Sequence, residues 1–277
     1  MGNCKFCGKP AGLLHSEHAE CEQLHENSKK QIVAEISQAL SPSGSVDALQ
    51  SHLTEIAQDG YISENEKQTL LIQGWTDAVN RYLEDGVLDE SEETRLIEFK
   101  NRLALAEADL DANGAFTKIV KAAVIRDLLN GVIPHRMRFD ANLPINWQKD
   151  EEVVWIFSNC EYLEDKTRRQ YVGGSQGVSI RIMKGLYYRV GAFTGQPIDR
   201  TERVRIDTGM VVVTNQRIYF AGSIKALRVP YAKIVSFQPF SDGIGIIRDA
   251  STAKPQIFVT GDGWFTYNLV TNLAHLS

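Results

Sequence analysis

Residues 4–21 read Cys-Lys-Phe-Cys-Gly-Lys-Pro-Ala-Gly-Leu-Leu-His-Ser-Glu-His-Ala-Glu-Cys, and this stretch decides how the chain begins to fold. Cys4 and Cys7 form a Cys-x-x-Cys pair, whose tight turn lets two thiolates face one ion. His18 and Cys21 are three residues apart, so they share a face if the chain is helical there. Together the four residues supply the nitrogen and sulfur ligands of a tetrahedral zinc site. Because all four ligands come from protein, we expect a structural site.

Two alternatives to this ligand set remain open. His15 is also three residues from His18, so it could replace one ligand or hydrogen-bond to a ligand. A redox Cys-x-x-Cys pair is the rival, but it needs a βαβ context that the sequence does not supply. The fourth cysteine, Cys160, lies far from the others. This pattern is a poor disulfide framework and is typical of a protein of the reducing cytoplasm.

The charge of the chain is divided unevenly along its length. Residues 1–144 hold 14 Lys and Arg against 23 Asp and Glu, whereas residues 145–277 hold 16 against 12. An acidic half and a mildly basic half indicate two units with different partners. They argue against nucleic-acid binding, which needs a dense basic face. No apolar run reaches the roughly 18 residues that span a bilayer.

The acidic half has the periodicity of helices. Apolar residues at three- and four-residue spacing predict a helix from about Ala19 to Leu40. A repeat follows, in which Asp59–Glu66 is echoed by Asp85–Glu92. Each begins with Asp-Gly and ends with Glu three residues after a Ser or Asp. Apolar residues between and beyond these turns predict further helices in a compact bundle.

The repeat can be interpreted as two EF-hand calcium loops or as two helix starts. In the EF-hand register the third ligand position falls on Ala57 in the first loop and on Leu83 in the second. Neither side chain can bind calcium. We therefore interpret Ser63 with Glu66, and Asp89 with Glu92, as capping boxes, and we expect no calcium binding. Over residues 46–130 the Asp-Gly turns resemble the TerB-like, degenerate EF-hand-like helical domains of bacteria.

The second half has the pattern of short strands separated by turns, followed by one helix from about Trp264 to Leu276. We expect an antiparallel sandwich or barrel that this helix closes, with Trp264 buried in the closure. The expected strands are residues 153–157, 178–182, 187–190, 210–214, 217–220, 234–237, 244–247 and 256–259.

The sequences Thr-Asn-Gln-Arg-Ile-Tyr-Phe at 214–220 and Val-Pro-Tyr-Ala-Lys-Ile at 229–234 resemble those of bacterial pleckstrin-homology (PH) or GRAM-like domains. The block at 181–191 resembles one in an uncharacterised bacterial family that carries such a domain. The resemblance covers residues 147–277 and implies binding to lipid, peptide or protein. The chain is thus expected to be an α+β multidomain protein: a zinc knuckle or ribbon at 1–26, an acidic helical bundle at 27–132 and a PH/GRAM-like domain at 145–277.

One polar cluster in the second half is a candidate ligand site. In PH-like folds, cationic residues on early strands and their loop can face a phosphate group. The competing interpretation is a solvated strand face, since most charged residues on strands face water. The candidate residues are Arg181, Lys184, Tyr187, Tyr188 and Arg189.

Residues 173–177, Gly-Gly-Ser-Gln-Gly, match the nucleophile elbow of hydrolases. That elbow needs a helix after the serine, whereas the residues after Ser175 alternate like a strand. We therefore expect a non-enzymatic, cytoplasmic binding or adaptor protein that docks to a protein partner. The alternative is peripheral attachment to a membrane, or binding of another anionic ligand, through the PH-like domain. A hydrolase using Ser175 is the third hypothesis.

Overall fold

The computed structural model describes residues 2–12, 15–84, 88–137, 143–146, 148, 150–171, 179–183, 186–189, 197–250 and 254–277. The chain divides into two compact units, Met1–Val132 and Ile133–Ser277. The α+β class expected from the sequence is confirmed, with helices in the first unit and an antiparallel sheet with a C-terminal helix in the second. A further division of the first unit into a knuckle at 1–26 and a bundle at 27–132 stays a prediction.

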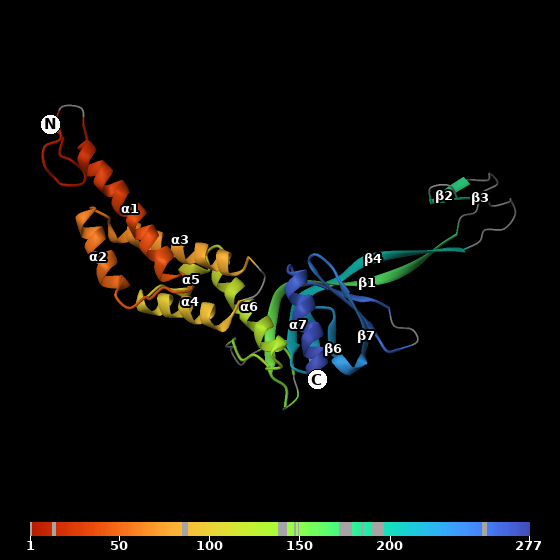
Figure 1. Cartoon of the computed structure of the whole chain (residues 1–277). Coiled ribbons are helices and arrows are strands. Elements are labelled where there is room, and N and C mark those ends of the chain that lie inside the picture. The colour runs from red at the N-terminus through yellow and green to blue at the C-terminus, as the bar shows by residue number, and fades with distance from the viewer. Residues whose placement is uncertain are drawn as a thin grey trace. The chain divides into compact units, whose positions relative to one another are not determined.

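The first unit begins with a loop and continues as helices (Figure 1). The helix expected from Ala19 to Leu40 is present and ends one residue earlier. The helices are α1 (Ala19–Ala39), α2 (Leu49–Asp59), α3 (Glu64–Tyr82), α4 (Glu90–Arg102), the short α5 (Glu107–Leu110) and α6 (Ala115–Leu129).

These helices share one hydrophobic core. Trp75 is fully buried, and its indole N–H donates to the carbonyl oxygen of Leu96 at 3.1 Å, which ties α3 to α4. Val33 on α1 is 44% exposed, so it lies outside this core. The expected core residues that the structure buries are Leu49, Leu53, Ile56, Leu71, Trp75, Val79, Tyr82, Leu96, Phe99 and Leu105.

Both capping boxes predicted from the repeat are confirmed. The Ser63 hydroxyl accepts from the backbone N–H of Glu66 at 3.3 Å, and the Glu66 carboxylate accepts from the backbone N–H of Ser63 at 3.0 Å. Asp89 and Glu92 make the same reciprocal pair at 2.9 and 3.1 Å at the start of α4. These side chains thereby satisfy N–H groups that a helix start leaves without partners. That the turns bind no calcium stays a prediction.

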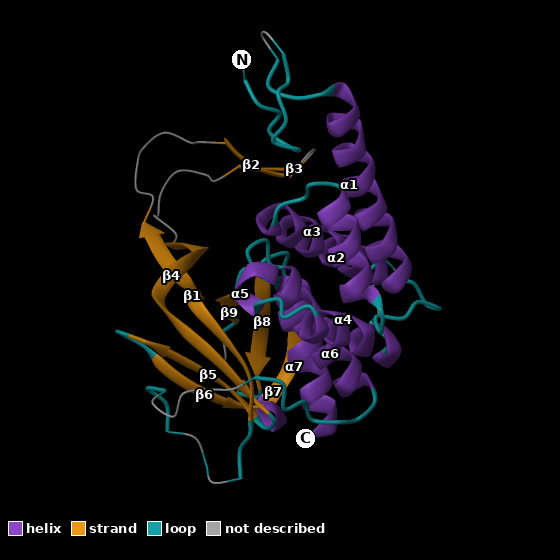
Figure 2. Cartoon of the chain, turned by 90° about the vertical axis from the view of Figure 1, so that its left-hand side faces the viewer, coloured by secondary structure: helices purple, strands orange, loops and turns teal. Residues whose placement is uncertain are grey.

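The second unit is built on a seven-stranded antiparallel sheet (Figure 2, orange) in the order β6-β5-β4-β1-β9-β8-β7. The strands are β1 (Val153–Tyr171), β4 (Pro197–Thr214), β5 (Arg217–Gly222), β6 (Ala226–Pro230), β7 (Ile234–Pro239), β8 (Gly243–Arg248) and β9 (Gln256–Val259); β2 (Ser179–Met183) and β3 (Leu186–Arg189) form a separate hairpin.

The sheet curls so that its two edges meet at one end. In a flat sheet the edge strands β6 and β7 would lie about 29 Å apart, from six spacings of about 4.8 Å. Only the short 3-10 turn Tyr231–Lys233 connects them. A link of that length spans at most about 14 Å. The edge strands must therefore approach each other, as in a barrel.

Two features of this sheet were missed by the sequence analysis. The first is β6, which has only five residues, Ala-Leu-Arg-Val-Pro, and ends in a proline that only an edge strand tolerates. The second is the length of β1 and β4, which pair with each other as far as Tyr171 and Pro197. Beyond Glu164 and Gly209 neither strand pairs with a further neighbour among the described residues, so they continue as a two-stranded ribbon (Figure 1).

The C-terminal helix α7 (Gly263–Leu276) packs against β7 and β8, as expected of a closing helix. The buried aromatic residue is Phe265, whose ring lies 4.7 Å from that of Trp155 and 5.9 Å from that of Phe157. The prediction for Trp264 is wrong, because its side chain is 58% exposed. Gly263 fixes this rotation: a β-carbon there would lie 1.9 Å from the carbonyl oxygen of Phe240. Trp264 therefore falls on the outer face.

Candidate metal centre

The first half of the candidate site is a tight turn. The backbone N–H of Gly8 donates to the carbonyl of Cys4 at 2.9 Å, and the N–H of Cys4 donates to the carbonyl of Lys9 at 2.7 Å. Gly8 adopts a φ of +72°, a conformation that glycine reaches without strain. These bonds hold Cys4 and Cys7 on the same side of the turn.

The second half of the site is the start of α1. His18 is the N-cap residue and Cys21 lies in the first turn, so the two project toward the same place. The His18 side chain makes no capping bond to the helix. The imidazole of His18 is thus available to bind a metal ion. In Figure 2 the residues before α1 form a loop at the N-terminal end of that helix.

The four predicted ligands converge. One ligand atom from each of Cys4, Cys7, His18 and Cys21 lies within 4.8 Å of the others. His18 Nδ1 is 3.4 Å from Cys7 Sγ and 3.7 Å from Cys21 Sγ. Ligands around a tetrahedral zinc ion lie about 3.5–3.8 Å apart, given Zn–S and Zn–N bonds of about 2.3 and 2.0 Å. The cluster could therefore hold a metal ion with little rearrangement.

The position of the proton on His18 also fits a role as a metal ligand. Its Nε2 lies 3.0 Å from the carbonyl oxygen of Pro10, which can only accept. Nε2 must therefore carry the proton, and Nδ1, which faces the thiols, is left to bind a metal. Such a bond from the outer ring nitrogen fixes the ring and raises the basicity of the ligand. A carbonyl group gives no side-chain signal, so the sequence could not reveal the part played by Pro10.

The pKa values of Cys4 and Cys21 are shifted in opposite directions. Burial opposes ionisation of Cys4, but hydrogen bonds from the backbone N–H groups of Cys7, His18 and Phe6 outweigh it and lower its pKa to about 6. Burial, with hydrogen bonds shared with Cys7 and Cys4, raises the pKa of Cys21 to about 11. The hydrogen bond to Pro10, followed by that to Cys7, raises the pKa of His18. Because zinc binds the thiolate, a metal ion would displace a proton from Cys21.

The remaining predicted site residues are placed as follows. His15 is exposed and contributes no atom to the cluster, so its alternate role stays a prediction. The backbone register of β2 and β3 sets Arg181 opposite Tyr187, and Ser179 opposite Arg189. Lys184 and Ser175 lie outside the described residues.

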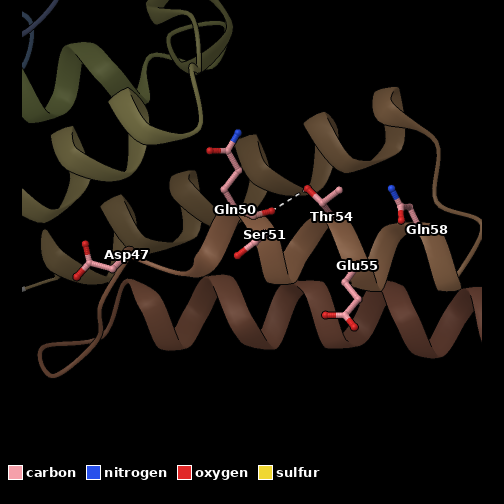
Figure 3. Close-up of a pocket in the computed structure, with 6 residues that line it drawn as sticks. All are labelled: Asp47, Gln50, Ser51, Thr54, Glu55 and Gln58. Carbon is pink, nitrogen blue, oxygen red and sulfur yellow. Dashed lines mark hydrogen bonds between the residues drawn. The ribbon is translucent and has the colours of Figure 1, made fainter.

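A shallow, open hollow of about 510 Å³ lies along α2. Figure 3 shows its polar side chains in a row on the helix and the turn before it, with the Thr54 hydroxyl donating to the carbonyl of Gln50 at 2.7 Å. The three- and four-residue spacing of these side chains could have revealed this polar face. They are Asp47, Gln50, Ser51, Thr54, Glu55 and Gln58.

No family model, curated protein or solved structure matches the chain. Among the described residues, no helix combines the length and the apolar character needed to cross a membrane. The site is therefore defined by its own geometry: three thiols and one imidazole gathered at the start of a helix.

Proposed function

We propose that the chain is a non-enzymatic zinc protein of the cytoplasm that docks to a protein partner through its helical and sheet units. The observation that carries the proposal is the closed donor set of Cys4, Cys7, His18 and Cys21. Four protein ligands complete a tetrahedral zinc site and leave no position for a substrate or a reactive water. Zinc bound in this way fixes structure, and three thiolates with one imidazole favour it over calcium or magnesium.

The architecture of the second unit supports a binding role. Seven antiparallel strands followed by one closing helix are what the PH/GRAM-like resemblance implies. Domains of that kind bind lipid, peptide or protein, and a fold by itself does not choose among them. We favour a protein partner because the hollow along α2 is shallow and polar, whereas small-molecule sites are concave and mostly apolar.

The test uses the full chain as bait in extract of its native host. A captured protein is then purified, and its binding to the chain is measured directly. We expect saturable, stoichiometric binding that persists at about 0.5 M salt, since an interface of standard size is not mainly electrostatic. Lack of any stoichiometric protein partner, or turnover of a substrate that Ser175→Ala abolishes, would contradict the proposal.

The second candidate function is attachment to an anionic membrane surface. It is favoured by the backbone register, which brings Arg181 opposite Tyr187 and Ser179 opposite Arg189 in the β2–β3 hairpin. Vesicles with anionic lipid would pellet the chain at low salt and release it at high salt. Arg181→Glu should abolish this pelleting, and Arg228→Glu, the same charge change on an exposed residue of β6, should not. Equal pelleting of the two variants would count against the hairpin.

A further inference from the structure

The loop that carries the two ligand cysteines contacts the helical core through one side chain. Phe6 lies between Cys4 and Cys7, and its ring centroid is 4.6 Å from that of His25 on α1. The same ring lies 6.3 Å from that of Tyr61, in the turn between α2 and α3. Aromatic rings at such separations attract each other beyond the effect of the area they bury. Phe6 thus connects the metal-binding turn to two separate parts of the first unit.

His25 carries this contact onward. Its side chain is almost fully buried, with 5% of the residue exposed. Its Nδ1 lies 2.9 Å from the carbonyl oxygen of Gly60, and its Nε2 lies 3.2 Å from Oε1 of Glu66. Both partners only accept hydrogen bonds, so both bonds form only when each ring nitrogen carries a proton. These two bonds and the contact with Phe6 fix the orientation of the His25 ring.

The turn that receives these bonds has a conformation that depends on close packing. Gly60 lies against Ser28 of α1, and a β-carbon on Gly60 would approach the Ser28 β-carbon to 2.2 Å. Tyr61 adopts a φ of +54°, which costs energy for a residue other than glycine. Glu66 completes the capping box with Ser63 and also lies 3.6 Å from Lys29. Surrounding contacts must hold such a turn in place.

We propose that metal binding at Cys4, Cys7, His18 and Cys21 is coupled, through Phe6 and His25, to the structure of the turn at residues 59–66. A metal joins both ends of the Cys4–Cys7 turn to α1, which holds Phe6 against His25. Without the metal, this loop has little apolar area to offset the entropy of its order. Phe6 then leaves His25, and the bonds to Gly60 and Glu66 loosen. The metal centre is thus a switch for the α2–α3 turn.

Linkage makes the proposal quantitative. If metal stabilises the docked turn by a given factor, the docked turn must strengthen metal binding by the same factor. Weakening the Phe6 contact should therefore lower zinc affinity even though Phe6 is not a ligand. A loop that folds independently of the helices would show no such reciprocity.

Hydrogen exchange on the full chain, with zinc or with chelator, tests this coupling. The reporters are the backbone N–H groups of Ser63 and Glu66, which bond to each other's side chains. In the unaltered chain we expect chelation to speed their exchange about tenfold or more, because the turn opens locally. An unchanged rate would overturn the proposal.

Two variants test the Phe6 contact and the His25 hydrogen bonds separately. Phe6→Ala should still bind about one zinc per chain, with lower affinity, and its reporters should exchange fast with or without metal. His25→Phe keeps a ring for Phe6 but loses both hydrogen bonds, so its reporters should also be insensitive to zinc. Val33→Ala, at a half-exposed position of the same helix, is the control and should respond like the unaltered chain. A full zinc response in Phe6→Ala would overturn the proposal.

Discussion

The N-terminal loop and the sheet of the second unit are ordered by different means. Among the described residues of the N-terminal loop and the first turn of α1 (2–12 and 15–21), Cys4 alone is buried. In the sheet, by contrast, Tyr162, Phe220 and Phe258 are fully buried, with ring centroids 5.3–6.1 Å apart. Burial of apolar area stabilises the sheet, whereas the loop needs bonds to a metal. The folding of the N-terminal loop should therefore depend on bound metal, whereas the folding of the sheet should not.

Removal of metal should give the largest difference between the loop and the sheet. We expect chelation to unfold the loop, because structural zinc supplies about 10–16 kcal/mol of apparent binding free energy in small zinc domains. The chain should then become sensitive to trypsin after Lys5, which mass spectrometry would detect. The thermal unfolding of the sheet, followed by its β-type circular dichroism, should stay unchanged. A loop that resists trypsin in chelator would contradict the assignment.

The sheet should instead respond to loss of one buried ring. Phe265→Ala should lower the free energy of unfolding of the second unit by about 3–5 kcal/mol, because the ring packs on Trp155 and Phe157. Trp264→Ala, at the preceding residue, is the matched control. Its effect should stay within about 0.5 kcal/mol, since Trp264 is largely exposed. Denaturant unfolding measures both. A larger loss from Trp264→Ala would mean that α7 is rotated from the orientation described.

Loss of a capping box should have an effect on stability between those of Phe265→Ala and Trp264→Ala. Ser63→Ala and Asp89→Ala should each cost about 1 kcal/mol, because each removes the acceptor for a backbone N–H at a helix start. Asn101→Ala removes an exposed side chain from the last turn of α4, away from the cap, and should cost less than about 0.5 kcal/mol. Thermal unfolding of the first unit measures all three. Equal costs would show that the caps contribute nothing specific.

The smallest expected effect is a pH dependence in the first unit. Hydrogen bonds from the Ser63 hydroxyl and backbone, aided by His25 and Lys29, lower the pKa of Glu66 from 4.5 to about 2. The stability from its ionised form is complete above about pH 5 and is lost as the pH falls toward 2. Since 39% of the side chain is exposed, solvent screening limits the effect to about 0.5 kcal/mol. The stability difference between the unaltered chain and Glu66→Gln should shrink over this range. A constant difference would contradict the assigned role.

The sequence predicts best where chemistry or periodicity is local. The ligand set follows from residue type and spacing, and the capping boxes follow from a Ser or Asp with Glu three residues later. Most of the helical core follows from periodicity. The strands were found where apolar and β-branched residues alternate, but the ribbon was missed because residues 165–171 are mostly polar.

The errors have a common cause, which is contact between residues distant in sequence. The rotation of α7 depends on how closely Gly263 approaches Phe240, and no pattern within residues 263–276 contains that information. In the same way, nothing near Phe6 predicts His25 as its neighbour. The carbonyl groups of Pro10 and Gly60 contribute through the backbone, so their side chains give no signal.

The most direct test of the central claim is the metal content of the full chain and two cysteine variants, purified without chelator. We expect about one zinc per chain in the unaltered protein and a large loss in Cys7→Ser, which removes one of four ligands. Cys160→Ala removes a cysteine that is buried in the sheet of the second unit and contributes no atom to the cluster, so it should keep about one zinc. Well under half an equivalent in the unaltered chain, or equal zinc in the unaltered chain and Cys7→Ser, would contradict the account.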